Sequence, residues 1–134
     1  MFLLIVRLLG VKRYAHFAFW YAKKSRGKEW VGLDESIIEY EKEEMMKFDV
    51  KEFNKIFAGL YDFKLQELSK IKVPVLIING EFESKSVFKH SEKMKDLIDN
   101  SSMVVIPNVG HTSNMENPEE FNKAMEKFLK GVEL

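Results

Sequence analysis

The chain of 134 residues contains no cysteine, no surplus of either charge and no long apolar run. Without cysteine, disulfide bonds and cysteine-ligated metal sites are excluded, and the composition is consistent with a reducing cytoplasm. Acidic and basic residues balance at 21 each, so binding to nucleic acid is not expected. The apolar residues 1–6 are followed at once by Arg7 and preceded by no basic region, so we expect neither a membrane span nor a signal peptide.

Histidine is also scarce, with three in the chain, and its placement argues against a metal centre. His16 and His90 lie in segments with helical periodicity, but neither has a metal-binding residue four positions later. We therefore interpret both as structural or surface residues. The glycines show no spacing typical of a phosphate-binding loop. We expect no metal and no other cofactor.

Two short apolar runs with a helical segment between them dominate the second half of the chain. Residues 73–79 and 102–107 are nearly all apolar and predict two strands. Strands joined by one amphipathic helix are expected to be parallel, with a right-handed crossover, so their carboxyl ends lie at the same edge of the sheet. Because ligands and catalytic groups gather at that edge, Glu83 and His111, each just past a strand, are predicted to be neighbours.

The first half of the chain is predicted to be helical. Residues 2–22 are heavily apolar and should bend or break near Gly10, and residues 25–28 are expected to form a loop. Asp34 then precedes a second helix over residues 35–47, whose run of charged residues is typical of a face in solvent.

A third helix is predicted from capping-box spacing, with Asp49 followed three residues later by Glu52. This helix should stop at or near Gly59. Residues 61–63 and 65–68 are expected to lead from it into the first strand.

A final helix is predicted by Asn117 at the N-cap, Pro118 at the first helical position and Gly131 at the end. The chain is therefore expected to divide into a helical segment, residues 1–68, and a segment of alternating strands and helices, residues 69–134.

Aromatic side chains crowd the second half of the first helix, among them Phe17, Trp20 and Tyr21. One interpretation is a helix buried against other helices. The other is that these three rings bind substrate by forming the wall of an apolar pocket.

Four motifs occur in an order that resembles the C-terminal third of an α/β-hydrolase: Leu-Ser-Lys-Ile-Lys-Val-Pro-Val-Leu-Ile-Ile-Asn-Gly-Glu at 68–81, Glu83, Val-Val-Ile-Pro-Asn-Val-Gly-His at 104–111, and Asn-Pro-Glu-Glu-Phe at 117–121. The family places its triad acid after the penultimate strand, its triad histidine in a Gly-His pair after the last strand, and often a similar Pro-Glu-Glu-Phe at the start of the final helix. The resemblance covers residues 66–131, and residues 1–65 occupy the place of the family's cap. It implies an α/β fold with a helical, cap-like N-terminal half followed by a β-α-β-α unit with two parallel strands.

The resemblance assigns roles to two residues. His111 corresponds to the general base, and Glu83 stands where the family usually has an aspartate that orients the histidine. Glu81 is a second, weaker candidate for the acid. The implied activity is that of an esterase-like or lipase-like serine hydrolase acting on a small acyl substrate.

The family's nucleophile motif, Gly-x-Ser-x-Gly, is absent, since no glycine here is followed by a serine two places later. Ser84, Ser86 and Ser113 follow the acid or the histidine and are not expected on a strand-to-helix elbow. The resemblance therefore implies that this chain supplies the histidine and the acid but not the nucleophile, and that it is inactive alone.

A sheet of only two parallel strands is rarely stable without neighbours. We therefore expect the open edge of the first strand to pair with a strand from another polypeptide chain. We expect either a homo-oligomer or a complementing N-terminal fragment. The alternative function is a non-catalytic, truncated module that serves assembly through this open edge.

Overall fold

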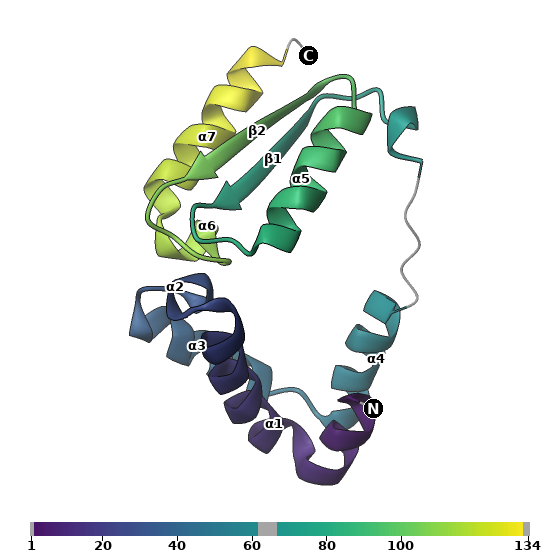
Figure 1. Cartoon of the computed structure of the whole chain (residues 1–134), viewed down its shortest axis with the longest axis vertical. Helices are drawn as coiled ribbons and strands as arrows, with labels where there is room; N and C mark the ends of the chain where they lie inside the picture. The colour runs from purple at the N-terminus through teal and green to yellow at the C-terminus, as the bar shows by residue number, and fades with distance from the viewer. Residues whose placement is uncertain (1, 62–66, 133–134) are drawn as a thin grey trace.

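The computed structural model describes residues 2–61 and 67–132 (Figure 1). In chain order its elements are α1 (Phe2–Arg26), α2 (Lys28–Val31), α3 (Glu35–Met46), α4 (Val50–Tyr61), the 3₁₀ helix η1 (Leu68–Lys70), β1 (Val75–Gly80), α5 (Lys85–Leu97), β2 (Ser101–Ile106), α6 (Ser113–Glu116) and α7 (Pro118–Gly131). No helix within the described residues is both long and apolar enough to cross a lipid bilayer.

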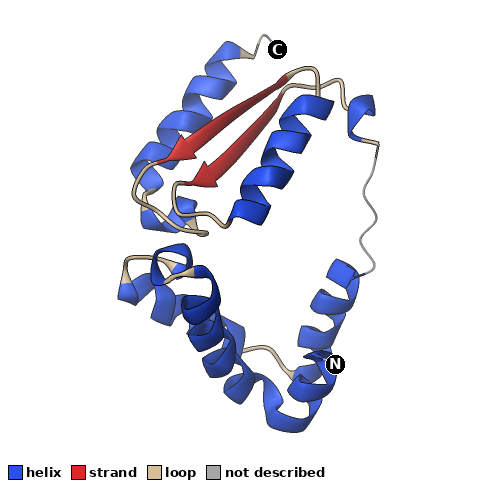
Figure 2. Cartoon of the chain, viewed as in Figure 1, coloured by secondary structure: helices blue, strands red, loops and turns tan. Residues whose placement is uncertain are grey.

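The predicted β-α-β-α unit is confirmed. Strands β1 and β2 are parallel, in a register that runs from Val75 opposite Ser101 to Gly80 opposite Ile106. Helix α5 makes the crossover, and α5 and α7 flank the two strands (Figure 2). Among the described residues β1 pairs with β2 alone, so its other edge has no strand beside it.

The helical half has its own core, built around Val6, Val11 and Phe53. The ring of Phe53 packs edge-on against Tyr14, with centroids 5.3 Å apart, and stacks on Phe57 at 4.5 Å. Tyr14 follows Val11 by three residues on α1 and Phe57 follows Phe53 by four on α4, so each helix turns one face to this core. Helix α1 is bent at Gly10, whose φ of 77° is open to glycine and costly for other residues, so the predicted bend is confirmed.

The loop predicted for residues 25–28 is wrong in most of its length. Helix α1 continues to Arg26, and after Gly27 the short helix α2 starts at Lys28. The basic residues in the last turn of α1 favour continuation of the helix, because they interact well with the negative end of its dipole. A single glycine with a φ of 99° is then enough to turn the chain.

Other boundaries differ by a few residues. Helix α4 ends at Tyr61 rather than at Gly59, and β1 begins at Val75 rather than at residue 73. The short elements η1 and α6 were not predicted, since three or four residues are too few to show a periodicity. The lead into the first strand over residues 62–66 lies outside the described residues.

The two predicted N-caps, Asp49 and Asn117, are confirmed, and Asp34 caps α3 in the same way. The carboxylate oxygen of Asp34 accepts a hydrogen bond from the Ser36 amide at 2.8 Å, and that of Asp49 accepts one from Glu52 at 2.8 Å. The side-chain oxygen of Asn117 accepts one from the Glu120 amide at 3.1 Å. Each cap satisfies an amide that the first turn of a helix leaves without a partner.

The Asn117 cap leads to a stability prediction for α7. Asn117→Ala should lower the free energy of unfolding by about 1 kcal/mol, because the first turn loses an acceptor for its amides. Urea unfolding followed by circular dichroism would measure this. Asn122→Ala, at an exposed position in the same helix, is the control and should not lower stability, because alanine is the better helix former. Equal effects of the two substitutions would contradict the role of the cap.

Candidate active site

The ends of β1 and β2 are tied together by backbone hydrogen bonds. The amide of Glu81 donates to the carbonyl of Ile106 at 2.9 Å, and the amide of Phe82 donates to that of Val109 at 3.0 Å. These bonds hold the turn after β1 against the loop after β2. The two loops that carry Glu83 and His111 are therefore held side by side, as the topology predicted.

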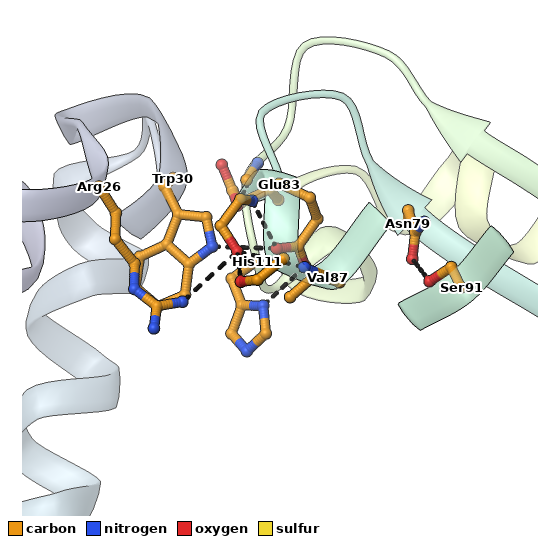
Figure 3. Close-up of polar contacts among 11 residues, drawn as sticks. Arg26, Trp30, Asn79, Glu83, Val87, Ser91 and His111 are labelled. Carbon is orange, nitrogen blue, oxygen red and sulfur yellow. Dashed lines mark hydrogen bonds and ion pairs between the residues drawn. The ribbon is translucent and has the colours of Figure 1, made fainter. Parts of the chain in front are cut away.

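Glu83 and His111 are in direct contact (Figure 3). Oε1 of Glu83 lies 2.7 Å from Nδ1 of His111. The Glu83 side chain is only 5% exposed, whereas the His111 side chain is 52% exposed. A buried carboxylate in this position fixes the tautomer and the plane of the imidazole and leaves Nε2 for proton transfer. Among the described residues Nε2 of His111 has no hydrogen-bond partner.

The second oxygen of Glu83 is held by two donors. The indole Nε1 of Trp30 donates to Oε2 at 2.9 Å, and the amide of Ser84 donates to it at 3.2 Å. Because both oxygens are hydrogen-bonded, the buried carboxylate has little freedom to rotate away from His111.

Glu81, the other candidate acid, has a different role. Its Oε2 accepts a hydrogen bond from the amide of Asn108 at 2.8 Å. Asn108 has a φ of 55°, and this bond supports the left-handed turn that follows β2. The structure therefore brings Glu83 to the histidine and uses Glu81 to shape the loop.

No described serine hydroxyl hydrogen-bonds to His111. Oγ of Ser84 caps α5 by accepting from the amide of Val87 at 3.4 Å, and it lies 2.9 Å from Oγ of Ser86. Ser113 is buried at the start of α6. These serines serve local structure within the described part of the chain.

Glu116 connects the helical half of the chain, α1 to α4, to the loop between β2 and α6 that carries His111, here called the histidine loop. This residue was not identified from the sequence. Its Oε1 accepts from the amide of Gly110 at 2.9 Å, and its Oε2 accepts from the amide of Leu33 at 3.0 Å. One carboxylate thus bridges the loop before α3 and the residue before His111. Glu116 lies on α6, which was not predicted, and its partner Leu33 is far away in the sequence, so no local pattern could have identified it.

A cavity of about 300 Å³ opens beside His111 between the helical half and the histidine loop. Its walls are mostly apolar, with one carboxyl group and one hydroxyl group. The lining residues are Ala18, Phe19, Ala22, Trp30, Val31, Glu41, Met45, His111 and Thr112. A space of this kind can hold a small apolar group next to the imidazole.

The structure does not bring Phe17, Trp20 and Tyr21 to this cavity. Their exposed fractions are 50%, 56% and 56%, so they are not buried against other helices either. They contact one another on the outer face of α1, with Phe17 5.9 Å from Trp20 and 6.0 Å from Tyr21 between ring centroids. At about 100° per residue these three share one face of the helix, while the cavity is lined by the opposite face, at residues 18, 19 and 22.

Known proteins resemble this chain over part of their length. No family model matches the chain. A segment of 72 residues is 36% identical to the 2-hydroxy-6-oxo-6-(2'-aminophenyl)hexa-2,4-dienoic acid hydrolase of Metapseudomonas resinovorans, covering 54% of this chain and 24% of that protein. The structure of MenH from S. aureus superposes with a TM-score of 0.78 and 24% identity, covering 96% of this chain and 48% of that one. A serine hydrolase of carbazole degradation, CarC, has a TM-score of 0.55 and 26% identity over 73% of this chain and 40% of that one.

The chain is related to the α/β-hydrolases. It covers 48% and 40% of these two structures and 24% of the curated relative. Within the α/β-hydrolase fold, the described residues form a helical half and the last two strands with their helices. These elements bring the predicted acid, Glu83, next to the predicted histidine, His111.

Glu41 is the one acidic residue of the cavity wall. Burial raises the pKa of the Glu41 carboxyl, and the nearby Glu116 carboxylate raises it further, while the Thr112 hydroxyl and His111 act in the opposite direction. The surroundings of Glu41 in this chain therefore disfavour a negative charge at the cavity wall.

The raised pKa of Glu41 predicts a pH-dependent effect on stability. The stability that this group contributes is present below the ordinary carboxyl pKa and is lost as pH rises through the raised value. Glu41→Gln stays neutral, so its stability relative to the unmodified chain should increase from about pH 4 to about pH 7. Urea unfolding at both pH values would measure this, with Glu43→Gln, at an exposed position on the same helix, as the control. A relative stability that is equal at both pH values would contradict the effect.

Proposed function

We propose that this chain carries the general base and the orienting acid of a serine hydrolase. The observation that supports it best is the contact between Glu83 Oε1 and His111 Nδ1 at 2.7 Å, with the carboxylate buried and the imidazole half exposed. An imidazole exchanges protons near neutral pH, which suits a group that must act first as a base and then as an acid. The hydrolase relationship supports this assignment.

In this proposal the serine and the oxyanion donors belong to a nucleophile-bearing segment outside the 134 residues. Its hydroxyl gives a proton to Nε2 of His111 while its oxygen bonds to the acyl carbon of the substrate. The imidazolium then returns the proton to the leaving alcohol. Water attacks the acyl-enzyme, gives one proton to Nε2, and the serine is regenerated when that proton returns to it. Glu83 stabilises the imidazolium in both halves of the cycle.

The substrate class that the cavity supports is an ester, or a related acyl compound, with a small apolar acyl group. The wall beside His111 is almost entirely apolar, and the one carboxyl group in it, Glu41, disfavours an anionic acyl chain. We propose no metal or other cofactor for this reaction, and no part for nucleic acid or a membrane. The cysteine-free composition suits the cytoplasm as the site of action.

The open edge of β1 supports the partner that this function requires. Residues Val75 to Gly80 present backbone donors and acceptors on the side away from β2. A parallel strand of the nucleophile-bearing segment would satisfy them and extend the sheet. The same edge also favours the alternative function, a non-catalytic module that assembles through this strand with a second copy of itself.

Rescue of activity tests the proposal. The chain would be assayed with p-nitrophenyl butyrate alone and after co-expression with the segment encoded directly upstream of its gene. We expect release of nitrophenol only from the mixture, which then also elutes as one complex from a sizing column. A folded complex without activity, a chain that forms a stable homo-oligomer instead, or upstream DNA without a Gly-x-Ser-x-Gly elbow would favour the non-catalytic module.

A further inference from the structure

Trp30, in the short helix α2, makes three separate contacts with the Glu83–His111 pair (Figure 3). Its indole N–H donates to Glu83, its ring stacks on His111, and its backbone carbonyl accepts from the amide of His111. We propose that Trp30 is a positioning residue, through which the helical half holds the acid and the histidine in register. This inference rests on the proposed function for its catalytic consequence, but the contacts can be tested without activity.

The first contact orients the acid. Nε1 of Trp30 lies 2.9 Å from Oε2 of Glu83, while Oε1 of the same carboxylate faces His111. A buried carboxylate that lost this donor would be left with the more distant Ser84 amide on that oxygen, at 3.2 Å. The indole therefore selects which oxygen of Glu83 is left to bind the histidine.

The second contact fixes the plane of the histidine. The rings of Trp30 and His111 have centroids 4.9 Å apart and an interplanar angle of 26°. Because the ring of His111 is half exposed, packing on one face restrains its rotation where the rest of the protein does not. Phenylalanine at position 30 could retain the stack but would lack the N–H group, so the two contributions are separable.

The third contact joins the backbones. The amide of His111 donates to the carbonyl of Trp30 at 3.0 Å. A Cβ atom on Gly110 would lie 2.4 Å from the carbonyl oxygen of Glu29 and 2.6 Å from that of Trp30. Helix α2 is therefore packed directly on the histidine loop, and any shift of the helical half would break all three contacts together.

Several charged groups face these two rings. Glu83 binds both rings, and Glu41 acts on His111 across the cavity. The guanidinium of Arg26 lies over the indole, 4.6 Å from its centroid, and also donates to Oγ of Ser84 at 3.5 Å. The positive charge of Arg26 on this side of the site complements the negative charge of the Glu83 carboxylate.

Fluorescence of the chain itself tests the stack. Trp20→Phe leaves Trp30 as the one indole, and a protonated imidazole in contact with an indole quenches its emission. We expect the emission of this variant to fall when acid is added and His111 takes up a proton. The fall should be absent from Trp20→Phe/His111→Gln. Identical pH curves for the two variants would overturn the inference.

Activity of the assembled enzyme tests the positioning role. Trp30→Phe should lower kcat by roughly tenfold or more and alter the acid limb of its pH profile, with KM nearly unchanged, because one hydrogen bond to a buried carboxylate is lost. Trp20→Phe, at an exposed ring of the same half, is the matched control and should retain kcat. An unchanged kcat and pH profile in Trp30→Phe would overturn the inference. If no assembly hydrolyses esters but the fluorescence fall is observed, the contact stands and the proposed function fails.

Discussion

Replacing His111 by alanine in the assembled enzyme should lower kcat by at least about a thousandfold, because His111 is, among the described residues, the histidine that a buried carboxylate holds in place for proton transfer. Glu83→Gln should cost a comparable factor, since an amide bonded to Nδ1 no longer fixes the required tautomer or stabilises the imidazolium. Initial rates of p-nitrophenyl ester hydrolysis would measure both effects. KM should change much less than kcat, because both groups act in proton transfer and His111 is only one of nine residues that line the cavity.

Two matched controls make the result specific. His90→Ala removes an exposed histidine on α5, and Glu81→Gln changes the carboxylate that supports the turn after β2. Both should retain kcat within about threefold of the unmodified enzyme. Activity that survives His111→Ala, or that depends on Glu81 as strongly as on Glu83, would contradict the assignment of the pair.

Replacing Gly80 by alanine should destabilise the chain by about 3 kcal/mol or more. A Cβ atom at this position would lie 2.0 Å from the carbonyl oxygen of Gly110 and 2.7 Å from that of Val109. Both obstacles are backbone atoms of the loop that carries His111, so no side chain can move aside to make room. The end of β1 and the histidine loop would have to separate. Urea unfolding of the purified chain would measure the loss.

Gly59→Ala provides the control for Gly80. Gly59 lies in α4, and an added Cβ would meet no atom within 4 Å. Alanine is the better helix former, so this variant should gain about 0.5–1 kcal/mol. If Gly80→Ala were as stable as Gly59→Ala, the close approach of β1 to the histidine loop would be wrong.

The sheet could be predicted because its signals are local. Two apolar, β-branched runs, one amphipathic stretch between them and the rule of right-handed crossover are enough to place Glu83 and His111 at one edge. The N-caps Asp34, Asp49 and Asn117 are likewise encoded within three residues of their partners.

The helical half was predicted less well, because the sequence indicated where its helices lie but not which face of each helix is buried. The aromatic residues Phe17, Trp20 and Tyr21 drew attention as a possible pocket wall, yet they share the outer face of α1. The cavity is lined by the less conspicuous Ala18 and Ala22 and by Phe19. Which face of an apolar helix turns inward depends on its neighbours, and a helix that is apolar on all sides gives no periodic signal to decide it.

The sequence by itself determined the crossover, the order of the elements and the acid–histidine pair at the edge of the sheet, since these follow from patterns within short stretches of chain. Only the tertiary structure decided that Trp30 and Glu116 hold that pair, that Glu81 does not belong to it, and where the cavity lies. Trp30 meets Glu83 across 53 positions, and Leu33 meets Glu116 across 83. Contacts between residues so far apart in the sequence form when the helical half packs against the half that contains the strands. The residues next to Trp30 or Glu116 in the sequence give no sign of these contacts.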